Sequence, residues 1–329
     1  MKIALLMNAK VRPGVITDRT MIKLKQLGEV CLNESDATDT DVIKSVIRDA
    51  DIAVTSWGNG PLTADILDCA PNLKLVAHAA GSVKPIVSDA LFDRSIPLIS
   101  SAVVLSSGVS ETALGFTISA AKNFYQLNQM IHEGGWKHDN HTITELFEIN
   151  IGVIGCGYAG KHYIELLQCF DVTILAYDPY LDAEKIRSMG AEKADLDRIL
   201  RESDIISLHA PSIPATRHMI NAETLAMMKD DVILINTARG SLIDEKALYE
   251  HMKSGKIKYT CIDVTDPEPP AADHPLRSLP NCIMTPHLAG QANNGKGRIG
   301  VHVYEEIQRL LNQEPLVSQV TRDMLATIA

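Results

Sequence analysis

A glycine motif constrains the fold more than any other feature of this sequence. Gly155-x-Gly157-x-x-Gly160 comes directly after the apolar run 149–154 and precedes a helix-compatible stretch. In such a motif the first glycine permits a tight strand-to-helix turn, and the second lets the backbone approach a phosphate. The third allows the helix to pack closely on the strand, and the helix N-terminus adds partial positive charge. The motif therefore predicts a strand–turn–helix unit that binds a dinucleotide.

An aspartate stands where such a unit needs one. Asp178 follows the next apolar run, 172–176, and lies about 20 residues beyond the glycines, which is the spacing of the ribose-binding acid. A carboxylate there accepts hydrogen bonds from the ribose hydroxyls and repels a 2′-phosphate. The sequence thus predicts NAD as the cofactor rather than NADP. The alternative is a glycine turn and a strand-end aspartate in a fold that binds no nucleotide.

Short apolar runs alternate with helix-like segments along the chain. We expect strands at 2–7, 51–55, 73–77 and 97–100, and then at 149–154, 172–176, 204–208, 232–236, 259–263 and 282–285. We expect helices at 109–131, 160–170, 183–189, 244–254 and 299–313, and a polar loop at 132–147. Apolar strands separated by helices are typical of parallel sheets buried on both faces. The prediction is an α/β protein with two doubly wound parallel-sheet domains.

Composition narrows the class of protein. The chain has 329 residues, 46% of them apolar, which suits about two domains with buried cores. Its net charge of −10, without a long basic run, argues against a nucleic-acid partner. The six cysteines form no CxxC pair, which predicts reduced thiols in a cytoplasmic protein. We expect no segment to reach the ~18–20 apolar residues of a membrane span, and therefore no membrane association.

Three polar side chains, Arg239, Glu268 and His287, each follow a late strand of the second series. The carboxyl ends of parallel strands meet at one edge of a sheet. Reduction of a 2-keto acid needs a cation that binds the carboxylate, for which the arginine fork is suited. It also needs a proton donor for the new hydroxyl, and a carboxylate beside an imidazole stabilises the protonated ring. The three residues therefore predict a hydride-transfer site.

Other interpretations of these residues stay open at this point. Arg239 alone also fits a surface arginine paired with Asp244 or Glu245. Glu268 alone fits a solvated turn, and His287 alone fits a structural histidine.

A metal site is a further alternative. His138, Asp139 and His141 lie close together in the polar loop. Since the histidines have no firm third ligand, we expect a solvated loop and no metal.

Four segments resemble the signatures of one family. NTARG (236–240), DPEPP (266–270), HPLRSLPN (274–281) and TPHLAG (285–290) are similar to those of the D-isomer-specific 2-hydroxyacid dehydrogenases, which include D-lactate, glyoxylate/hydroxypyruvate and 3-phosphoglycerate enzymes. The resemblance implies an NAD-dependent oxidoreductase that transfers a hydride between nicotinamide and C2 of a small 2-hydroxy or 2-keto acid. It implies Arg239 as the substrate-binding arginine, His287 as the acid/base and Glu268 as its partner, and leaves the acid unresolved.

The resemblance also implies a domain arrangement. A Rossmann NAD-binding domain, 102–290, is inserted into a flavodoxin-like substrate domain made of 1–101 and 291–329. The segment 109–131 resembles the family's dimer-forming helix, so a homodimer is expected.

Further contacts follow from the same resemblance. The cofactor-binding residues it implies, besides the three glycines and Asp178, are Tyr158 and Ala159 at the pyrophosphate, His209, Ala210, Pro211 and Thr216 at the adenine and pyrophosphate, and Thr237, Ala238, Asp263, His287 and Gly290 towards the nicotinamide. The backbone of Ala80, Gly81 and Ser82 is implied to bind the substrate carboxylate together with Arg239.

The chain departs from the family pattern in the substrate loop. Ser82 replaces a glycine, Lys84-Pro85 replaces Asp-Asn, and Leu105 stands where many members have Asn. Lys84 fits either a more anionic substrate or a solvated surface, and Trp57 fits either a pocket wall or a core position. Two alternatives to a 2-hydroxyacid dehydrogenase remain open: an enzyme that oxidises formate or phosphite on the same fold, and an NAD-sensing corepressor-like protein.

Overall fold

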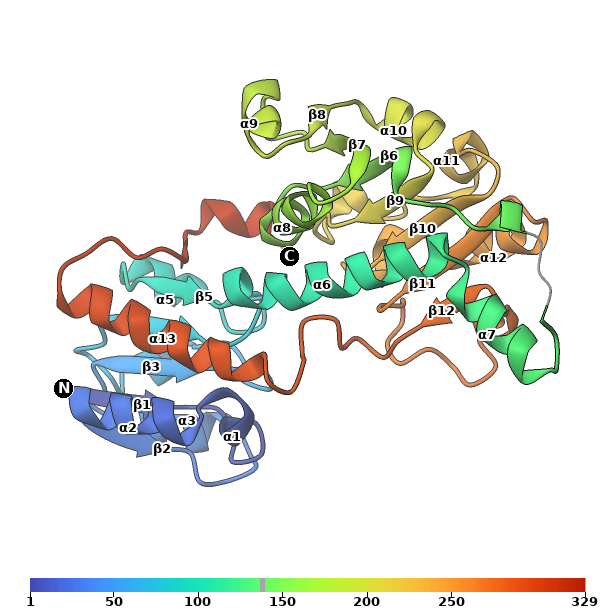
Figure 1. Ribbon diagram of the computed structural model, residues 1–329. Coiled ribbons are helices and arrows are strands. Elements are labelled where there is room, and N and C mark those ends of the chain that lie inside the picture. Colours follow the sequence, from blue (N-terminus) through green and yellow to red (C-terminus); the bar gives the residue numbers. More distant parts are fainter. Residues whose placement is uncertain (137–139, 329) are drawn as a thin grey trace. The chain divides into compact units, whose positions relative to one another are not determined.

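The computed structural model describes residues 1–136 and 140–328 and divides into two compact units (Figure 1). The first unit joins Met1–Leu105 to Gln291–Ala329, and the second unit is the continuous segment Ser106–Gly290.

The first unit contains a six-stranded sheet in the order β13-β5-β4-β3-β1-β2. Its strands are β1 (Lys2–Leu5), β2 (Glu29–Leu32), β3 (Ile52–Thr55), β4 (Leu75–His78), β5 (Leu98–Ser100) and β13 (Gln319–Val320). All pairings are parallel except β13 with β5, where Gln319 lies opposite Ile99. The first five strands have the flavodoxin-like order, which confirms the predicted fold class for this unit.

Helices cover both faces of this sheet. They are α1 (Arg12–Val15), α2 (Asp18–Leu27), α3 (Thr40–Ile47), α4 (Ala64–Leu67), α5 (Asp89–Asp93) and α13 (Lys296–Leu311), with a 3-10 turn η5 at Asp323–Ala326. One core cluster includes Ile47 of α3 and Leu91 of α5, and the other includes Leu24 of α2 and Val303 of α13. The helix after the second unit therefore completes the core of the first.

The second unit contains a seven-stranded parallel sheet in the order β12-β11-β10-β9-β6-β7-β8. Its strands are β6 (Phe147–Ile154), β7 (Asp171–Tyr177), β8 (Glu192–Lys193), β9 (Ile205–Leu208), β10 (Val232–Asn236), β11 (Ile257–Ile262) and β12 (Cys282–Met284). Strand order reverses between β6 and β9. Ligands of doubly wound sheets bind at the carboxyl ends of the strands at such a reversal. The strand order is that of a Rossmann domain, which confirms the fold class predicted for this unit.

Helices also cover both faces of the second sheet. They are α6 (Ala102–Ala121), α7 (Phe124–His132), α8 (Tyr158–Leu167), α9 (Ala183–Ser188), α10 (Leu196–Glu202), α11 (Ala222–Met227) and α12 (Glu245–Lys253), with 3-10 turns η1 (Asn140–Thr142), η2 (Pro214–Thr216), η3 (Gly240–Leu242) and η4 (Pro275–Ser278). Phe116 of α6 and Ile164 of α8 belong to one core cluster, and Ile199 of α10 and Leu248 of α12 belong to the other.

The single helix predicted at 109–131 is wrong. The helix begins earlier, at Ala102, and is interrupted at Asn123, which has a φ of +57°. Asn123 is fully buried, and its Oδ1 accepts a hydrogen bond of 2.6 Å from the hydroxyl of Tyr259. This contact holds the left-handed conformation, which Asn tolerates better than most residues.

The expectation that no segment is long and apolar enough to span a membrane is also wrong. Among the described residues, α6 meets the criteria of length and composition, with a mean hydropathy of 1.2. Glu111 is its only charged residue, and Ser, Thr and Gly lower the hydropathy little. The helix packs Ala113, Phe116 and Ala120 into the core of the second unit, and a core helix passes the same test.

The alternative of a metal site at His138, Asp139 and His141 concerns residues that lie mostly outside the described ranges. His138 and Asp139 lie outside the described residues. In the rest of the chain, no group of three His, Cys, Asp or Glu side chains is arranged to hold a metal ion. The six cysteines, all within the described ranges, are free thiols.

Candidate active site

The glycine motif forms a turn at the carboxyl end of β6. Gly155 has a φ of +95°, and a Cβ added there would lie 2.6 Å from the backbone nitrogen of Ala210. A Cβ on Gly160 would lie 1.9 Å from the carbonyl oxygen of Gly155. Gly157 precedes α8, and no described heavy atom lies within 4 Å of its Cβ position. Gly155 and Gly160 thus permit the turn. Gly157 leaves open space at the N-terminus of α8, where a phosphate fits.

The first residues of α8 are held against α6. Tyr158 begins the helix with 49% of its surface exposed, and the carbonyl oxygen of Ala159 accepts a hydrogen bond of 2.8 Å from Oγ of Ser110. One turn later, the hydroxyls of Thr117 and Tyr163 lie 2.6 Å apart. These bonds fix the helix whose N-terminus follows the glycine turn.

Asp178 lies beside the glycine turn, directly after β7. Its Oδ2 accepts a hydrogen bond of 2.9 Å from the backbone N–H of Cys156, and its Oδ1 accepts one of 2.9 Å from the N–H of Tyr180. A fixed carboxylate at this point suits ribose hydroxyls and disfavours a 2′-phosphate.

Two buried polar atoms at neighbouring strand ends have no hydrogen-bond partner in the described part of the chain. They are Nδ1 of His209, after β9, and Oγ1 of Thr237, after β10. Nε2 of His209 lies 2.9 Å from Oγ of Ser207, and its ring lies 5.1 Å from that of Tyr163. Burial lowers the pKa of His209 to about 3, so the ring is neutral. Because buried polar groups normally have partners, these atoms fit a polar ligand such as NAD at this edge.

The segment 210–216 folds back on itself. Oγ1 of Thr216 donates to the carbonyl of Pro211 at 2.6 Å and accepts from the N–H of Ile213 at 3.0 Å. The hydroxyl thus closes the turn that carries Ala210 and Pro211. The contacts of these residues with the cofactor stay predictions.

Arg239 lies in a short turn after β10 that Asn236 shapes. Nδ2 of Asn236 donates to the carbonyl of Arg239 at 2.9 Å, and its Oδ1 accepts from the N–H of Ala238 at 3.0 Å. Burial lowers the pKa of Arg239, and the charge of Glu268 opposes that shift. The alternative pairing of Arg239 with Asp244 or Glu245 is wrong, because Asp244 caps α12 and Glu245 pairs with His274.

Glu268 and His287 form the pair that the sequence predicts. Oε2 of Glu268 lies 2.7 Å from Nδ1 of His287, and its Oε1 accepts a hydrogen bond of 3.1 Å from the N–H of Thr265. His287 has a φ of +55°, and both side chains are partly exposed, at 46% for His287 and 38% for Glu268. The carboxylate is held on both oxygens, and the ring nitrogen that faces it is defined.

Asp263 organises the segment that carries His287. Its carbonyl accepts the N–H of His287 at 2.8 Å. Its carboxylate accepts the hydroxyl of Thr285 at 2.5 Å and the N–H groups of Leu288 and Ala289 at 3.0 and 2.8 Å. The buried carboxylate therefore shapes the turn, and its predicted contact with the nicotinamide stays a prediction. The same turn ends at Gly290, whose backbone packs near Gly108.

The predicted carboxylate-binding loop lies after β4 in the first unit. The carbonyl of Gly81 accepts Oγ–H of Ser100 at 2.6 Å, and the carbonyl of Ala80 accepts the N–H of Ser101 at 3.1 Å. His78, at the end of β4, lies 2.9 Å from Oγ1 of Thr55. Burial lowers the pKa of His78 to about 4, although a hydrogen bond to the backbone of Ser82 opposes the shift. The loop is thus anchored through carbonyls and a neutral histidine.

The residues that depart from the family pattern take different positions. A Cβ on Gly81 would lie 3.5 Å from Leu105, so this leucine packs directly on the loop. Trp57 is half-buried and packs against the core cluster beside α13. Lys84 is exposed. Trp57 therefore packs at the edge of this core.

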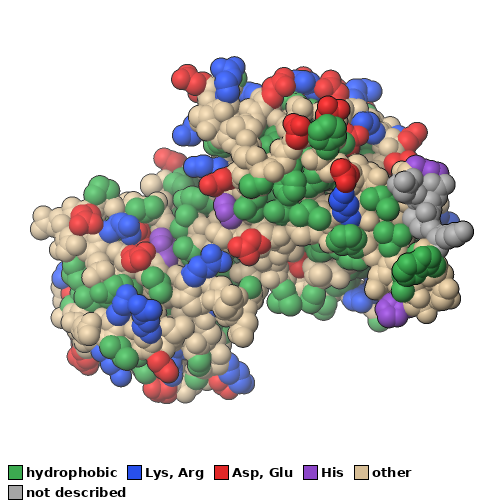
Figure 2. Space-filling view, in the orientation of Figure 1, with side chains coloured by type: hydrophobic (Ala, Val, Ile, Leu, Met, Phe, Trp, Pro, Cys, Tyr) green, Lys and Arg blue, Asp and Glu red, His purple; other side chains and the backbone are tan. Residues whose placement is uncertain are grey.

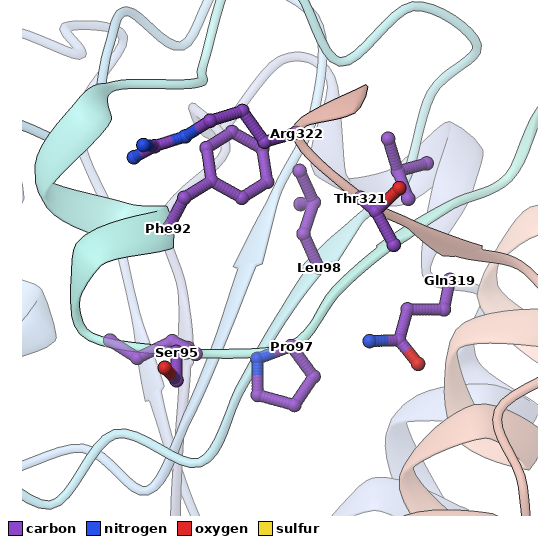
Figure 3. A pocket seen from close by; sticks show the side chains of 9 residues that line it. Phe92, Ser95, Pro97, Leu98, Gln319, Thr321 and Arg322 are labelled. Carbon is purple, nitrogen blue, oxygen red and sulfur yellow. The ribbon is translucent and has the colours of Figure 1, made fainter. Parts of the chain in front are cut away.

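A cavity of about 380 Å³ in the first unit lies away from these residues. Phe92, Leu98, Gln319 and Arg322 are among the side chains around it, between the end of α5, β5 and β13 (Figure 3). The guanidinium of Arg322 stacks over the Phe92 ring and pairs with Asp93 at 2.6 Å. The positive charge of Arg322 is therefore balanced by the Asp93 carboxylate.

Comparison with known proteins tests what these units are. Residues 114–289 match the family model described as D-isomer specific 2-hydroxyacid dehydrogenase, NAD binding domain. The chain belongs to this family. The matched region lies within the second unit, so the predictions of the family and of NAD as its cofactor are confirmed.

Individual relatives agree with this assignment. The chain is 35% identical over 88% of its length to D-3-phosphoglycerate dehydrogenase of Methanocaldococcus jannaschii, of which it spans only 55%. It is 34% identical over 83% of its length to hydroxypyruvate reductase of Thermotoga maritima, covering 89% of that protein. A phosphoglycerate oxidoreductase structure from Rhizobium etli superimposes with a TM-score of 0.83 over 98% of this chain and 99% of that one, at 24% identity, and shows the fold.

Sequence reasoning missed three residues that shape this candidate site. Asn236 holds the Arg239 turn, Thr265 binds Glu268, and Glu245 accepts the N–H of Asp266 at 3.0 Å. Asn236 carried a signal, because a polar residue at the end of an apolar strand often shapes the following turn. The other two are contacts between segments, which the sequence pattern does not show.

Proposed function

We propose that this chain transfers a hydride between NAD and C2 of a small 2-hydroxy or 2-keto acid. The observation that carries the proposal is the Glu268–His287 pair at 2.7 Å, in the unit that matches the family's NAD-binding domain. NAD, when bound, supplies or accepts the hydride.

His287 is the proposed proton carrier. Since Nδ1 faces the Glu268 carboxylate, exchange with the substrate falls to Nε2. In reduction the imidazolium gives its Nε2 proton to the carbonyl oxygen as C2 becomes saturated, and in oxidation the neutral ring takes the hydroxyl proton. The carboxylate stabilises the charged ring in both directions.

Arg239 is the proposed anchor of the substrate carboxylate. Its partly desolvated guanidinium, beside Glu268, interacts more strongly with an anion than an exposed cation does. Two parallel N–H donors bind a carboxylate in one orientation, which also directs the carbonyl oxygen.

The substrate proposal includes the loop Ala80, Gly81 and Ser82 as a second contact for the carboxylate. We propose the first unit as the substrate domain on this basis. The relatives named for hydroxypyruvate reduction and phosphoglycerate oxidation make hydroxypyruvate, glyoxylate and 3-phosphohydroxypyruvate the first compounds to test.

We also propose that the enzyme is a cytoplasmic homodimer. Phe124, Ile131, Trp136 and Phe147 are between 46% and 83% exposed. Figure 2 shows hydrophobic side chains over α6 and α7 on this face of the second unit. Large exposed apolar side chains favour an interaction surface, and a second copy presents the same surface. Light scattering on the wild type and on Ile131→Glu tests this, and a monomeric wild type contradicts it.

The test of function is a screen of 2-keto acids with NADH. Purified protein is mixed with glyoxylate, hydroxypyruvate, pyruvate, phenylpyruvate, 2-ketoisocaproate or 3-phosphohydroxypyruvate, and NADH loss is followed by absorbance. We expect turnover with at least one acid and much weaker turnover with NADPH. Binding of NADH without turnover of any acid would contradict the dehydrogenase proposal and favour an NAD-sensing protein.

A further inference from the structure

A second histidine–carboxylate pair lies in the unit that carries Arg239, Glu268 and His287. Oε2 of Glu245, the first residue of α12, lies 2.9 Å from Nε2 of His274, just before η4. The two side chains are only 12% and 16% exposed. The mechanism proposed above uses neither residue.

The carboxylate of Glu245 does not serve its own helix. Asp244 caps α12, accepting the N–H groups of Lys246 and Ala247. Burial raises the pKa of Glu245, although His274 and the N–H of Asp266 oppose that shift. A largely buried carboxylate is costly unless its oxygens are bonded, and here one oxygen faces His274 while the other accepts the N–H of Asp266 at 3.0 Å. The bonds of this side chain are therefore directed at another segment, the loop that carries Glu268.

The backbone of Thr265, whose carbonyl forms the peptide with Asp266, contacts both parts of the site. A Cβ on Gly240, the residue after Arg239, would lie 2.0 Å from the carbonyl carbon of Thr265. The N–H of Thr265 donates to Oε1 of Glu268. We therefore expect a shift of the Thr265 backbone to press on the Arg239 turn through the Thr265 carbonyl and to weaken the bond from the Thr265 N–H to Glu268.

The loop is held at its other end by a different side chain. Arg277 donates from Nε to the carbonyl of Ala271 at 3.0 Å and from Nη2 to that of Pro270 at 3.1 Å. On the Asp266 side, Glu245 holds the backbone N–H and His274 holds Glu245, while Arg217 forms an exposed ion pair of 3.3 Å with the Asp266 carboxylate.

We propose that Glu245 and His274 are positioning residues for hydride transfer, which fix the Thr265–Asp266 peptide and through it Glu268 and Arg239. This inference rests on the proposed function. Small displacements of catalytic groups cost large factors in rate, so the pair contributes to kcat without touching the substrate.

The kinetic test compares four variants with the wild type. Glu245→Ala removes the acceptor of Asp266, and we expect kcat to fall on the order of tenfold while the dissociation constant of NADH is unchanged. Glu245→Gln keeps a carbonyl oxygen for the same N–H and should recover most of kcat. His274→Gln should lie between the two. Glu250→Gln, an exposed glutamate on the same helix, should match the wild type.

The second readout needs no turnover. Amide hydrogen exchange of Asp266 and Thr265, measured by NMR, should accelerate about tenfold in Glu245→Ala and remain unchanged in Glu250→Gln. Faster exchange at Asp266 alone, with Thr265 and kcat unaffected, would overturn the proposal. A wild type without activity on any acid contradicts the proposed function, whereas the exchange rates still test the anchor. If the alanine variant does not fold, wild-type kcat and wild-type exchange at Asp266 and Thr265 in His274→Gln would overturn the inference.

Discussion

The backbone N–H of His287 donates to the carbonyl of Asp263 at 2.8 Å, while the Asp263 carboxylate binds the two residues that follow the histidine. One buried residue at the end of β11 therefore sets the conformation of the turn after β12. The position of the imidazole depends on this turn as well as on its contact with Glu268.

Asp263→Ala should weaken both the fold and the reaction. Three donors lose their acceptor, and the buried one among them, the N–H of Ala289, costs about 1–3 kcal/mol when it is left unbonded. We expect the free energy of unfolding to fall by about this amount in urea titrations. The exposed Asp197→Ala on α10 serves as control. Equal stability of the two variants would show that Asp263 does not hold the turn.

His287→Ala should lower kcat by about 10²–10⁴-fold because the proton carrier is lost. NADH affinity, measured by fluorescence titration, should stay near the wild-type value, since the glycine turn is untouched. His251→Ala on α12 is the matched histidine control. Full turnover of the His287 variant on the best acid would remove this residue from the mechanism.

Arg239→Lys should raise KM for the keto acid about tenfold or more, because an ammonium does not reproduce the two-point contact. Steady-state kinetics with Arg201→Lys, an exposed arginine on α10, gives the comparison. Unaltered KM and kcat would exclude Arg239 as the carboxylate anchor.

Asp178→Ala should reduce the preference for NADH over NADPH about tenfold, because a hydrogen-bond acceptor for the ribose and a charge opposing the 2′-phosphate are both removed. The ratio of kcat/KM for the two cofactors measures this, with Glu184→Ala on α9 as control. An unchanged ratio would argue against a ribose contact.

The buried His78 makes the first unit sensitive to acid. Its pKa is lowered to about 4, against about 6.5 in an unfolded chain, so the unfolded state binds more protons between these values. Stability is therefore complete above pH 6.5 and is lost as pH falls towards 4, by on the order of 3 kcal/mol. His78→Gln should lose correspondingly less over this range. Parallel pH profiles of unfolding in the two proteins would contradict the assignment.

The sequence predicts most of the strands but misses three edge strands, β2, β8 and β13; β2 has no fully buried residue. The predicted strand 232–236 has the same bounds as β10. Its four apolar residues and Asn236 are all buried, so the apolar run coincides with the strand. The two-residue strands β8 and β13 were not predicted, since so few residues show no periodicity. The break at Asn123 depends on the hydroxyl of Tyr259, far along the chain, and no local pattern predicts it.

The residues of the candidate site likewise differ in how well the sequence predicts them. Arg239, Glu268 and His287 are recognisable because each follows a strand, and the order of parallel strands brings such residues to one edge. The Glu245–His274 pair is not recognisable, because it joins the start of a helix to a loop. Sequence patterns thus indicate residues that follow strands, and they miss contacts that brace one loop against another.

The first unit is discontinuous in the chain, and this affects its biosynthesis. Ile299, Val303 and Ile307 of α13 and Val320 of β13 are buried in its core, yet they follow the whole of the second unit. On the ribosome, the nucleotide-binding unit is therefore available in full while the first unit still lacks a helix and an edge strand. The first unit thus begins first along the chain and is completed last.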